Sequence, residues 1–432
     1  MSHHDHSHES GCPEYRGLSR REFIASSSSL SAAALVFPDW LPRITFANNF
    51  SSTRDIIVSV FLRGAADGMA MVIPHFEPRY FSLRPNIRTP APDSLAANRA
   101  IALDNRFSIP PAMSGLLPAY RAGDLLVMHA AGQRTNNSRS HFDAQRYMEV
   151  GKPADDTISS GWLGRHLATV PPIAAAPVLR GIGLSTGLAK TLVGAPQTLP
   201  IADPANYNIG GSATTRAARM DLLKANYEGS VNPLRAAALD AVGTMDVLSR
   251  LNINAYTPAS GATYPNTGFA RGLRSIAALI KSDIGLEAAS IDIGGWDTHA
   301  MQDPNGGQMA NVMQQFAQGL GAFWADVVNT GYRVTVVAMS EFGRNVPENG
   351  SAGTDHGRAS VMFAMGKRIA GGRVYVQSWP GIEAAQLENR MDLQVTLDYR
   401  DVLAEIVQNR LENKNLSFVF PGWTPTFRGV TK

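Results

Sequence analysis

Residues 55–62, DIIVSVFL, form a short and largely apolar run that ends in Arg63-Gly64. A run of this length without polar alternation is typical of a strand that is covered on both faces, as in a parallel sheet. Similar runs follow along the chain at 125–131, 288–293, 333–339 and 361–365. Helical patterns separate them at 110–122, 141–150, 269–281, 309–329 and 398–411. Apolar strands that alternate with helices predict an α/β fold with a mostly parallel sheet sandwiched by helices.

The composition fits a globular protein. The chain has 432 residues, of which 44% are hydrophobic and 17% are charged, so it is long enough for one large domain and too apolar for a disordered chain. The net charge is +3 without any basic stripe, and we therefore expect no nucleic-acid partner. Residues 185–266 are less regular, with helical patterns only near 213–227 and 232–252. We expect this region to be a cap or an insertion within a domain that spans 48–432.

The N-terminus resembles a twin-arginine signal peptide. Residues 19–24, SRREFI, contain paired arginines, and a weakly apolar stretch follows at 25–37. Thr45-Phe46-Ala47 has small residues at the cleavage-determining positions, which predicts a signal peptide at 1–47 and a mature chain that starts near Asn48. We therefore expect the twin-arginine translocase to deliver the protein to the periplasm or the exterior. The alternative is an ordinary N-terminus that happens to contain two arginines.

Two absences limit the chemistry. Cys12 is the only cysteine, and it lies inside the predicted signal peptide, so the mature chain has no disulfide, thiol nucleophile or cysteine-ligated zinc. No apolar run reaches the roughly 18 residues that a transmembrane helix needs, and we expect no stable membrane anchor.

Polar residues gather where the predicted strands end. Ligands of such sheets bind beyond the carboxyl ends of the strands. Histidine, carboxylate and hydroxyl residues occur together with glycines in these loops, which are 64–68, 136–141, 294–299, 340–344 and, ahead of the last strand, 353–357. Imidazole and carboxylate groups together predict a divalent metal site. In the alternative, the loops bind no metal: Asp297 and His299 cap a helix and Asp355 holds a tight turn.

Ser138 and Ser140 precede a predicted helix. A serine nucleophile at this position would gain from the positive end of the helix dipole. The alternative role is a helix N-cap, which is the better interpretation of Ser138, whereas Ser140 fits both roles equally. Arg139 or Arg344 could hold an anionic oxygen in bidentate fashion, and either could equally form a salt bridge.

These motifs together resemble the bacterial family called domain of unknown function 1501, over about residues 55–411. The resemblance is based on the following motifs: Arg-Gly-x-x-Asp-Gly at 63–68, RSHF at 139–142, GWDTH at 295–299, SEFGR at 340–344 and GTDHG at 353–357. That family looks like a member of the alkaline phosphatase-like superfamily, which also contains sulfatases and cofactor-independent phosphoglycerate mutases. The resemblance therefore implies an alkaline phosphatase-like fold.

The resemblance also implies roles for single residues. Asp67 matches the superfamily's first aspartate, and Ser140, or less well Ser138, matches its nucleophile. Asp297 and His299 match an Asp/His loop, with Asp292 as a rival for Asp297. The chain departs from the pattern after the next strand, where Glu341 stands in place of an Asp-His pair. Asp355-His356 looks like that pair, but it precedes a strand as the superfamily's last histidine does. One imidazole is then missing, which implies one ion or two weakly held ones.

These arguments predict an exported metal-dependent hydrolase that acts on small or polymeric anionic esters of the phosphate type, less readily of the sulfate type. The expected ligands of a divalent ion (Zn, Mn, Ca or Mg) are Asp67, Asp297, His299, Glu341, Asp355 and His356. The expected catalytic group consists of Ser140, Ser138, Arg139, Arg344 and His141. The alternative is a non-catalytic exported binding or surface-associated protein on the same fold.

Overall fold

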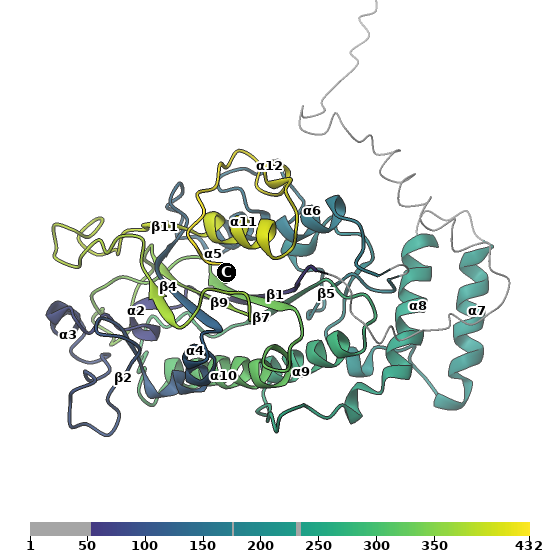
Figure 1. Cartoon of the computed structure of the whole chain (residues 1–432), viewed down its shortest axis with the longest axis horizontal. Coiled ribbons are helices and arrows are strands. Elements are labelled where there is room, and N and C mark those ends of the chain that lie inside the picture. The colour runs from purple at the N-terminus through teal and green to yellow at the C-terminus, as the bar shows by residue number, and fades with distance from the viewer. Residues whose placement is uncertain (1–52, 175–176, 230–234) are drawn as a thin grey trace, which may run out of the picture.

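A nine-stranded sheet forms the centre of the molecule (Figure 1). The computed structural model describes residues 53–174, 177–229 and 235–432; the predicted signal peptide at 1–47 lies outside them. The strands follow the order β10-β4-β9-β8-β1-β7-β5-β6, and β11 pairs with β4. Their bounds are β1 Ile56–Leu62, β4 Leu125–Gly132, β5 Gly181–Gly183, β6 Thr198–Pro200, β7 Ala288–Ile293, β8 Val334–Ser340, β9 Ser360–Met365, β10 Arg373–Tyr375 and β11 Leu397–Asp398.

Within this sheet only β9 runs against the other strands. β1 lies between β7 and β8 and is parallel to both, with Val60 opposite Ile291 and Ala338. β9 is antiparallel to β8 on one side and to β4 on the other. The predicted α/β fold with a mostly parallel sheet is therefore confirmed. Because β9 is reversed, the loop that precedes it lies at the same sheet edge as the loops that follow β1, β4, β7 and β8.

Helices cover both faces of the sheet (Figure 1). Successive side chains of a strand point to opposite faces, so β1 contributes Val58 and Val60 to one apolar core and Ile57 and Phe61 to the other. The first core is closed by α4 (Leu117–Arg121), α9 (Gly268–Lys281) and α10 (Gln308–Phe323). The second is closed by α5 (His141–Val150), α6 (Trp162–Thr169), α11 (Tyr399–Asn409) and α12 (Leu416–Val419).

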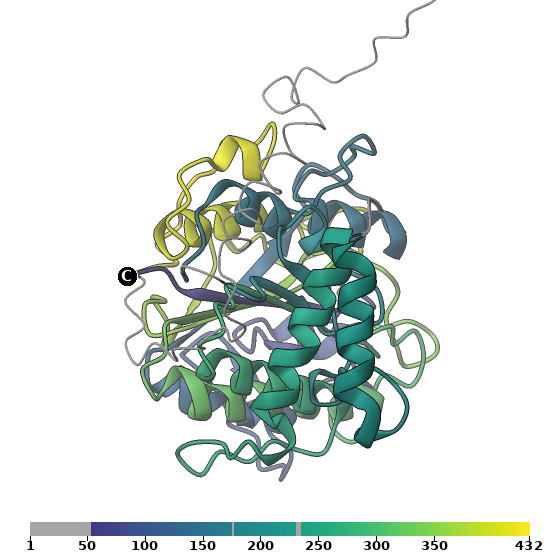
Figure 2. The same cartoon turned by 90° about the vertical axis from the view of Figure 1, so that its right-hand side faces the viewer.

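The irregular region at 185–266 is only partly separate from the sheet. Its strand β6 belongs to the sheet and pairs with β5. Farther along, α7 (Arg216–Glu228) and α8 (Arg235–Leu251) lie at one end of the molecule (Figure 1) and pack against each other, as the view onto that end shows (Figure 2). No side chain of α7 is buried, so the two helices form an outlying hairpin.

The long helix expected at 309–329 is divided. It consists of α10 and a wider π-type turn at Trp324–Val328. In that turn the buried Asp326 accepts hydrogen bonds from the hydroxyl groups of Tyr256 and Tyr264 and from Lys281 Nζ. These contacts tie the end of the irregular region to the helical layer. Among the described helices, none has the length and apolar character needed to span a membrane.

Candidate metal centre

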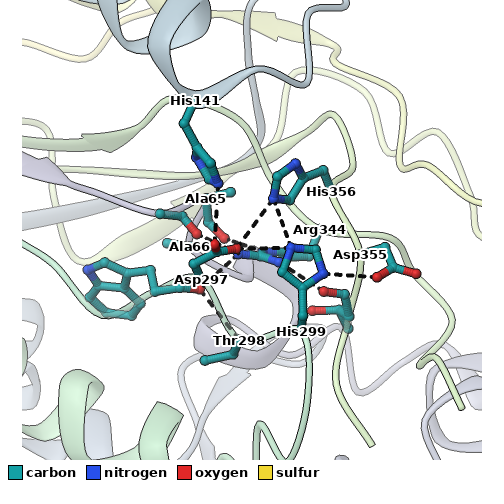
Figure 3. A network of polar contacts seen from close by, with 12 residues as sticks. Ala65, Ala66, His141, Asp297, Thr298, His299, Arg344, Asp355 and His356 are labelled. Atoms are coloured by element: carbon teal, nitrogen blue, oxygen red, sulfur yellow. Dashed lines mark hydrogen bonds and ion pairs between the residues drawn. The ribbon is translucent and has the colours of Figure 1, made fainter. Parts of the chain in front are cut away.

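Three histidines and one aspartate from three separate segments of the chain meet at the carboxyl edge of the sheet (Figure 3). His141 begins α5 after β4, Asp297 and His299 follow β7, and His356 precedes β9. The side chains of Asp297 and His299 are 48% and 44% exposed, so the cluster is open to solvent. Of the predicted metal ligands, Asp297, His299 and His356 converge here, and His141, which was predicted to be catalytic, joins them.

Asp297 lies at the centre of the cluster. Its Oδ1 atom is 3.1 Å from Nε2 of His299 and 3.3 Å from Nε2 of His356. Its Oδ2 atom is 3.6 Å from Nε2 of His141. The two rings of His299 and His356 also face each other, with their Nε2 atoms 3.0 Å apart. All three imidazoles thus direct the same ring nitrogen toward one carboxylate.

A buried carboxylate fixes the ring of His141. Its Nδ1 atom lies 2.8 Å from Oε1 of Glu341, and because an ionised carboxylate can only accept, Nδ1 must carry the proton. Nε2 of a neutral His141 is then a lone-pair acceptor, and this buried atom has no hydrogen-bond partner. The ring also stacks on Phe342, with the ring centroids 5.1 Å apart.

The other two rings are oriented in the same way. Nδ1 of His299 lies 2.9 Å from Oδ1 of Asp355, and Nδ1 of His356 lies 2.9 Å from the carbonyl oxygen of Arg139. Both partners are acceptors, so both Nδ1 atoms carry protons and both Nε2 atoms of the neutral rings present lone pairs. This outer layer of acceptors is the arrangement that surrounds histidine ligands in metal sites.

Acceptors that face one another require a positive charge between them. Three lone pairs and a carboxylate converge here, so either one ring binds a second proton or a cation lies among them. Ligand atoms of His141, Asp297 and His356 all lie within 4.8 Å of one another, and His299 Nε2 contacts two of these residues. Two imidazole nitrogens and one carboxylate oxygen, with the third imidazole beside them, are ligand types that hold zinc and similar ions. The residues therefore fit a divalent cation.

The local environment favours the metal-binding protonation state of Asp297 and His356, whereas it favours the protonated ring of His141. Burial by itself raises the pKa of Asp297, but Arg344, His356 and His299 together outweigh it, and the pKa lies below the usual value. The hydrogen bond to Glu341 raises the pKa of His141. Burial lowers the pKa of His356, which disfavours a second proton on that ring. An ionised carboxylate beside a neutral imidazole is the state that binds a metal ion.

Close backbone contacts bring the loops together. A Cβ atom at Gly64, where φ is +118°, would lie 2.7 Å from the backbone nitrogen of Asp297, and one at Gly353 would lie 2.3 Å from the backbone of His299. Only glycine permits these approaches. Arg344 is 1% exposed and binds the loops from inside, since it donates to the carbonyl oxygens of Gly64, Ala65, Trp296 and Thr354 and to Asp297 Oδ1.

Arg344 and Arg139 do not have the expected substrate-binding geometry. The donors of Arg344 are all used within the protein, so this residue orients Asp297. The side chain of Arg139 pairs with Asp392, and its backbone carbonyl holds His356. Both guanidinium groups are thus paired with carboxylates of the protein.

Asp67 is placed apart from the cluster, contrary to its expected role as a ligand. It is fully buried and forms an ion pair with Arg84, whose Nη1 and Nη2 atoms lie 2.5 and 3.2 Å from its oxygens. Gln302 donates to the same carboxylate at 2.6 Å, and Asp67 also caps the short helix α2 (Gly68–Met71). These contacts give it a structural role beneath the site.

Glu341 and Asp355 also differ from the expected ligands. Both carboxylates bind the Nδ1 atom of a histidine, on the side of the ring opposite the cluster. Of the rivals Asp292 and Asp297, only Asp297 reaches the cluster. Asp292 is instead paired with Arg63, at 3.0 Å.

The helix cap is Ser140, not Ser138. Ser140 precedes α5 and its Oγ atom accepts from the backbone nitrogen of Asp143 at 3.4 Å. Ser138 lies two residues before Ser140, and its Oγ atom accepts a hydrogen bond from the backbone nitrogen of Ser140. Ser140 is exposed and directly precedes a histidine of the cluster.

Sequence reasoning placed His141 with the catalytic residues and overlooked Gln145. Both residues bind Glu341. The spacing of His141, Gln145 and Glu149, four residues apart on a predicted helix, was the available signal, because such residues share one helix face.

A family model matches most of the chain. The model of a family described as protein of unknown function (DUF1501) matches residues 54–413, a range that includes every loop of the cluster. No curated protein matches the chain.

Proposed function

Because the chain belongs to the DUF1501 family, whose function is unknown, we propose its function from the site: a metal-dependent hydrolase of phosphate-type esters. The observation that supports this proposal is the convergence of three imidazole Nε2 atoms on the carboxylate of Asp297. The cluster lies at the solvent-exposed edge of the sheet where ligands of such folds bind.

The proposed ligands are Nε2 of His141, His299 and His356 and a carboxylate oxygen of Asp297. Three imidazoles favour a borderline ion such as Zn²⁺ or Mn²⁺ over Ca²⁺ or Mg²⁺, which prefer oxygen ligands. A bound divalent ion would supply Lewis acidity toward an ester oxygen. The chain's own contribution is to fix the three rings in the tautomer that leaves Nε2 free.

Ser140 is the proposed nucleophile. Its hydroxyl group is exposed at the N-terminus of α5, next to His141. Its capping bond to Asp143 is long, at 3.4 Å, and leaves its proton available to a second partner. The positive end of the helix dipole stabilises developing negative charge on the serine oxygen and on the anion that it attacks.

The relationship to the alkaline phosphatase-like superfamily is part of this proposal. A serine at a helix start, an Asp-x-His loop after a strand and a histidine before the last core strand support it. Two contacts depart from the superfamily pattern: Asp67 is paired with Arg84, and Glu341 is hydrogen-bonded to Nδ1 of His141. We therefore propose one ion rather than two.

A second candidate function is metal binding without turnover. It is favoured by the fact that Ser140 serves as a helix cap and that the guanidinium groups of Arg344 and Arg139 are already paired with Asp297 and Asp392. In this case the exported protein would bind an ion, or a partner through that ion, at the same cluster.

A turnover assay separates the two functions. The purified protein is assayed on an aryl phosphate with Zn²⁺, Mn²⁺, Ca²⁺ or Mg²⁺, and its metal content is measured by mass spectrometry. Metal-dependent turnover that is lost in His356→Ala supports the hydrolase. One bound ion per chain without turnover on phosphate or sulfate esters favours the binding protein, and a protein that binds no ion rules out both.

A further inference from the structure

A row of polar side chains continues from the cluster along α5 into the protein. His141, Gln145 and Glu149 are four residues apart and share one face of this helix. We propose that Gln145 is a positioning residue, which holds the carboxylate of Glu341 and through it sets the tautomer and orientation of His141. The inference rests on the metal centre proposed above.

Glu341 is the link between Gln145 and the cluster. It is fully buried, and its Oε1 atom accepts three hydrogen bonds: from Nδ1 of His141 at 2.8 Å, from Nε2 of Gln145 at 2.8 Å and from the backbone nitrogen of Gly64 at 2.9 Å. A buried carboxylate without a directly bound arginine or lysine depends on each of its donors. Loss of the Gln145 amide therefore removes a third of the donors that fix this oxygen.

Arg63 determines which way the Gln145 amide faces. Nη1 of Arg63 lies 3.1 Å from Oε1 of Gln145. A guanidinium can only donate and an ionised carboxylate can only accept. The amide oxygen must therefore face Arg63 and the amide nitrogen must face Glu341. The glutamine side chain has a single orientation that satisfies both neighbours.

Arg63 is itself held on two sides. Its guanidinium makes two hydrogen bonds to Glu149, at 2.9 and 3.1 Å, and two to Asp292, at 3.0 and 3.2 Å. Glu149 lies on α5 and Asp292 on β7, whereas Arg63 follows β1. The guanidinium thus joins α5 to the end of the sheet. It fixes the position of α5, the helix that carries His141, relative to β7 and the rotation of this helix about its axis.

A tautomer measurement tests the proposal in the metal-free protein. With ¹⁵N-labelled histidine, wild-type His141 at high pH should show the Nδ1–H form that the bond to Glu341 requires. In Gln145→Leu this form should give way to a mixture of the two tautomers, because Glu341 loses one of the three donors to Oε1 and is held less firmly by Gly64 and Ser340. A tautomer unchanged by Gln145→Leu overturns the proposal.

Zn²⁺ titration adds a second readout. We expect Gln145→Leu to weaken binding about 10- to 100-fold, as for other losses of an outer hydrogen bond in a metal site. Arg146→Leu is the matched control: it lies on the same helix, and its side chain binds Asp156 and the carbonyl oxygen of Ile158 instead. Equal losses in both variants would mean general damage to α5 and would contradict the proposal. A wild-type protein that binds no Zn²⁺ refutes the proposed function, whereas the tautomer measurement still decides the role of Gln145.

Discussion

The Nε2 atoms of His299 and His356 lie 3.0 Å apart, although each ring has its Nδ1 atom against a hydrogen-bond acceptor. Two neutral rings in these tautomers would bring two lone pairs together. The pair is therefore stable only with a positive charge between the rings. A metal ion supplies that charge without the loss of either outer hydrogen bond.

Metal binding should raise the thermal stability of the protein. An ion at 100 times its dissociation constant adds about 2.7 kcal/mol to the free energy of unfolding, which corresponds to a few degrees in Tm. We expect Zn²⁺ or Mn²⁺ to raise Tm in calorimetry and a chelator to reverse the change. In His356→Ala the added ion should leave Tm unchanged; an equal rise there would place the ion elsewhere.

The two roles of Ser140 can be separated by Ser140→Asn. Asparagine caps helices as well as serine does, so Tm should hardly change, whereas turnover of an aryl phosphate should be abolished because the hydroxyl is gone. Ser140→Ala should lose turnover and also about 1 kcal/mol of stability. Ser138→Ala is the control that keeps both. Full turnover by Ser140→Asn would contradict the assignment of the nucleophile.

Asp67 should matter for stability rather than for metal affinity. Asp67→Ala leaves the buried guanidinium of Arg84 without its partner, and the loss of one member of such a pair costs about 3 to 5 kcal/mol. Denaturant unfolding measures this cost. The exposed pair of Asp246 and Arg250 is the comparison, since Asp246→Ala should cost about 0.5 kcal/mol or less. If Asp67→Asn folds but loses Zn²⁺ affinity, Asp67 is a ligand after all.

Two buried histidines outside the cluster should make the protein sensitive to acid. Burial lowers the pKa of His129 to about 4 and that of His166 to about 3, so both rings are neutral in the folded protein. The unfolded chain binds these protons near pH 6.5. Their contribution to stability is therefore complete above pH 6.5 and is lost as pH falls below it, by about 1.4 kcal/mol per pH unit for each ring. Denaturant unfolding between pH 7 and 5 should show this slope, and His166→Gln should reduce it.

Export should depend on the arginine pair at 20–21. Replacement of both residues (Arg20→Lys with Arg21→Lys) keeps the charge but removes the guanidinium groups, and the full-length precursor should then accumulate in the cytoplasm. Cell fractionation with immunodetection measures the distribution. Unchanged delivery of the mature chain to the periplasm would refute the twin-arginine signal.

The sequence by itself determined the five core strands, the alternating helices and the sheet edge at which polar loops gather. It could do so because apolar runs and helical periods are local properties of the chain. The sequence did not determine the direction of β9, because an apolar run looks the same whether its strand is parallel or antiparallel to its neighbours. That direction decides that His356 lies beside Asp297.

The tertiary structure decided which of the polar loop residues form the cluster. Asp67 was a reasonable ligand from its position after β1, but packing places Arg84 against it, 17 residues away. Glu341 lies behind His141 because the backbone of Gly64, 277 residues distant, and Gln145 bind the same oxygen. Contacts of this kind depend on how helices and strands pack, and no local pattern encodes the side of an imidazole ring on which a carboxylate lies.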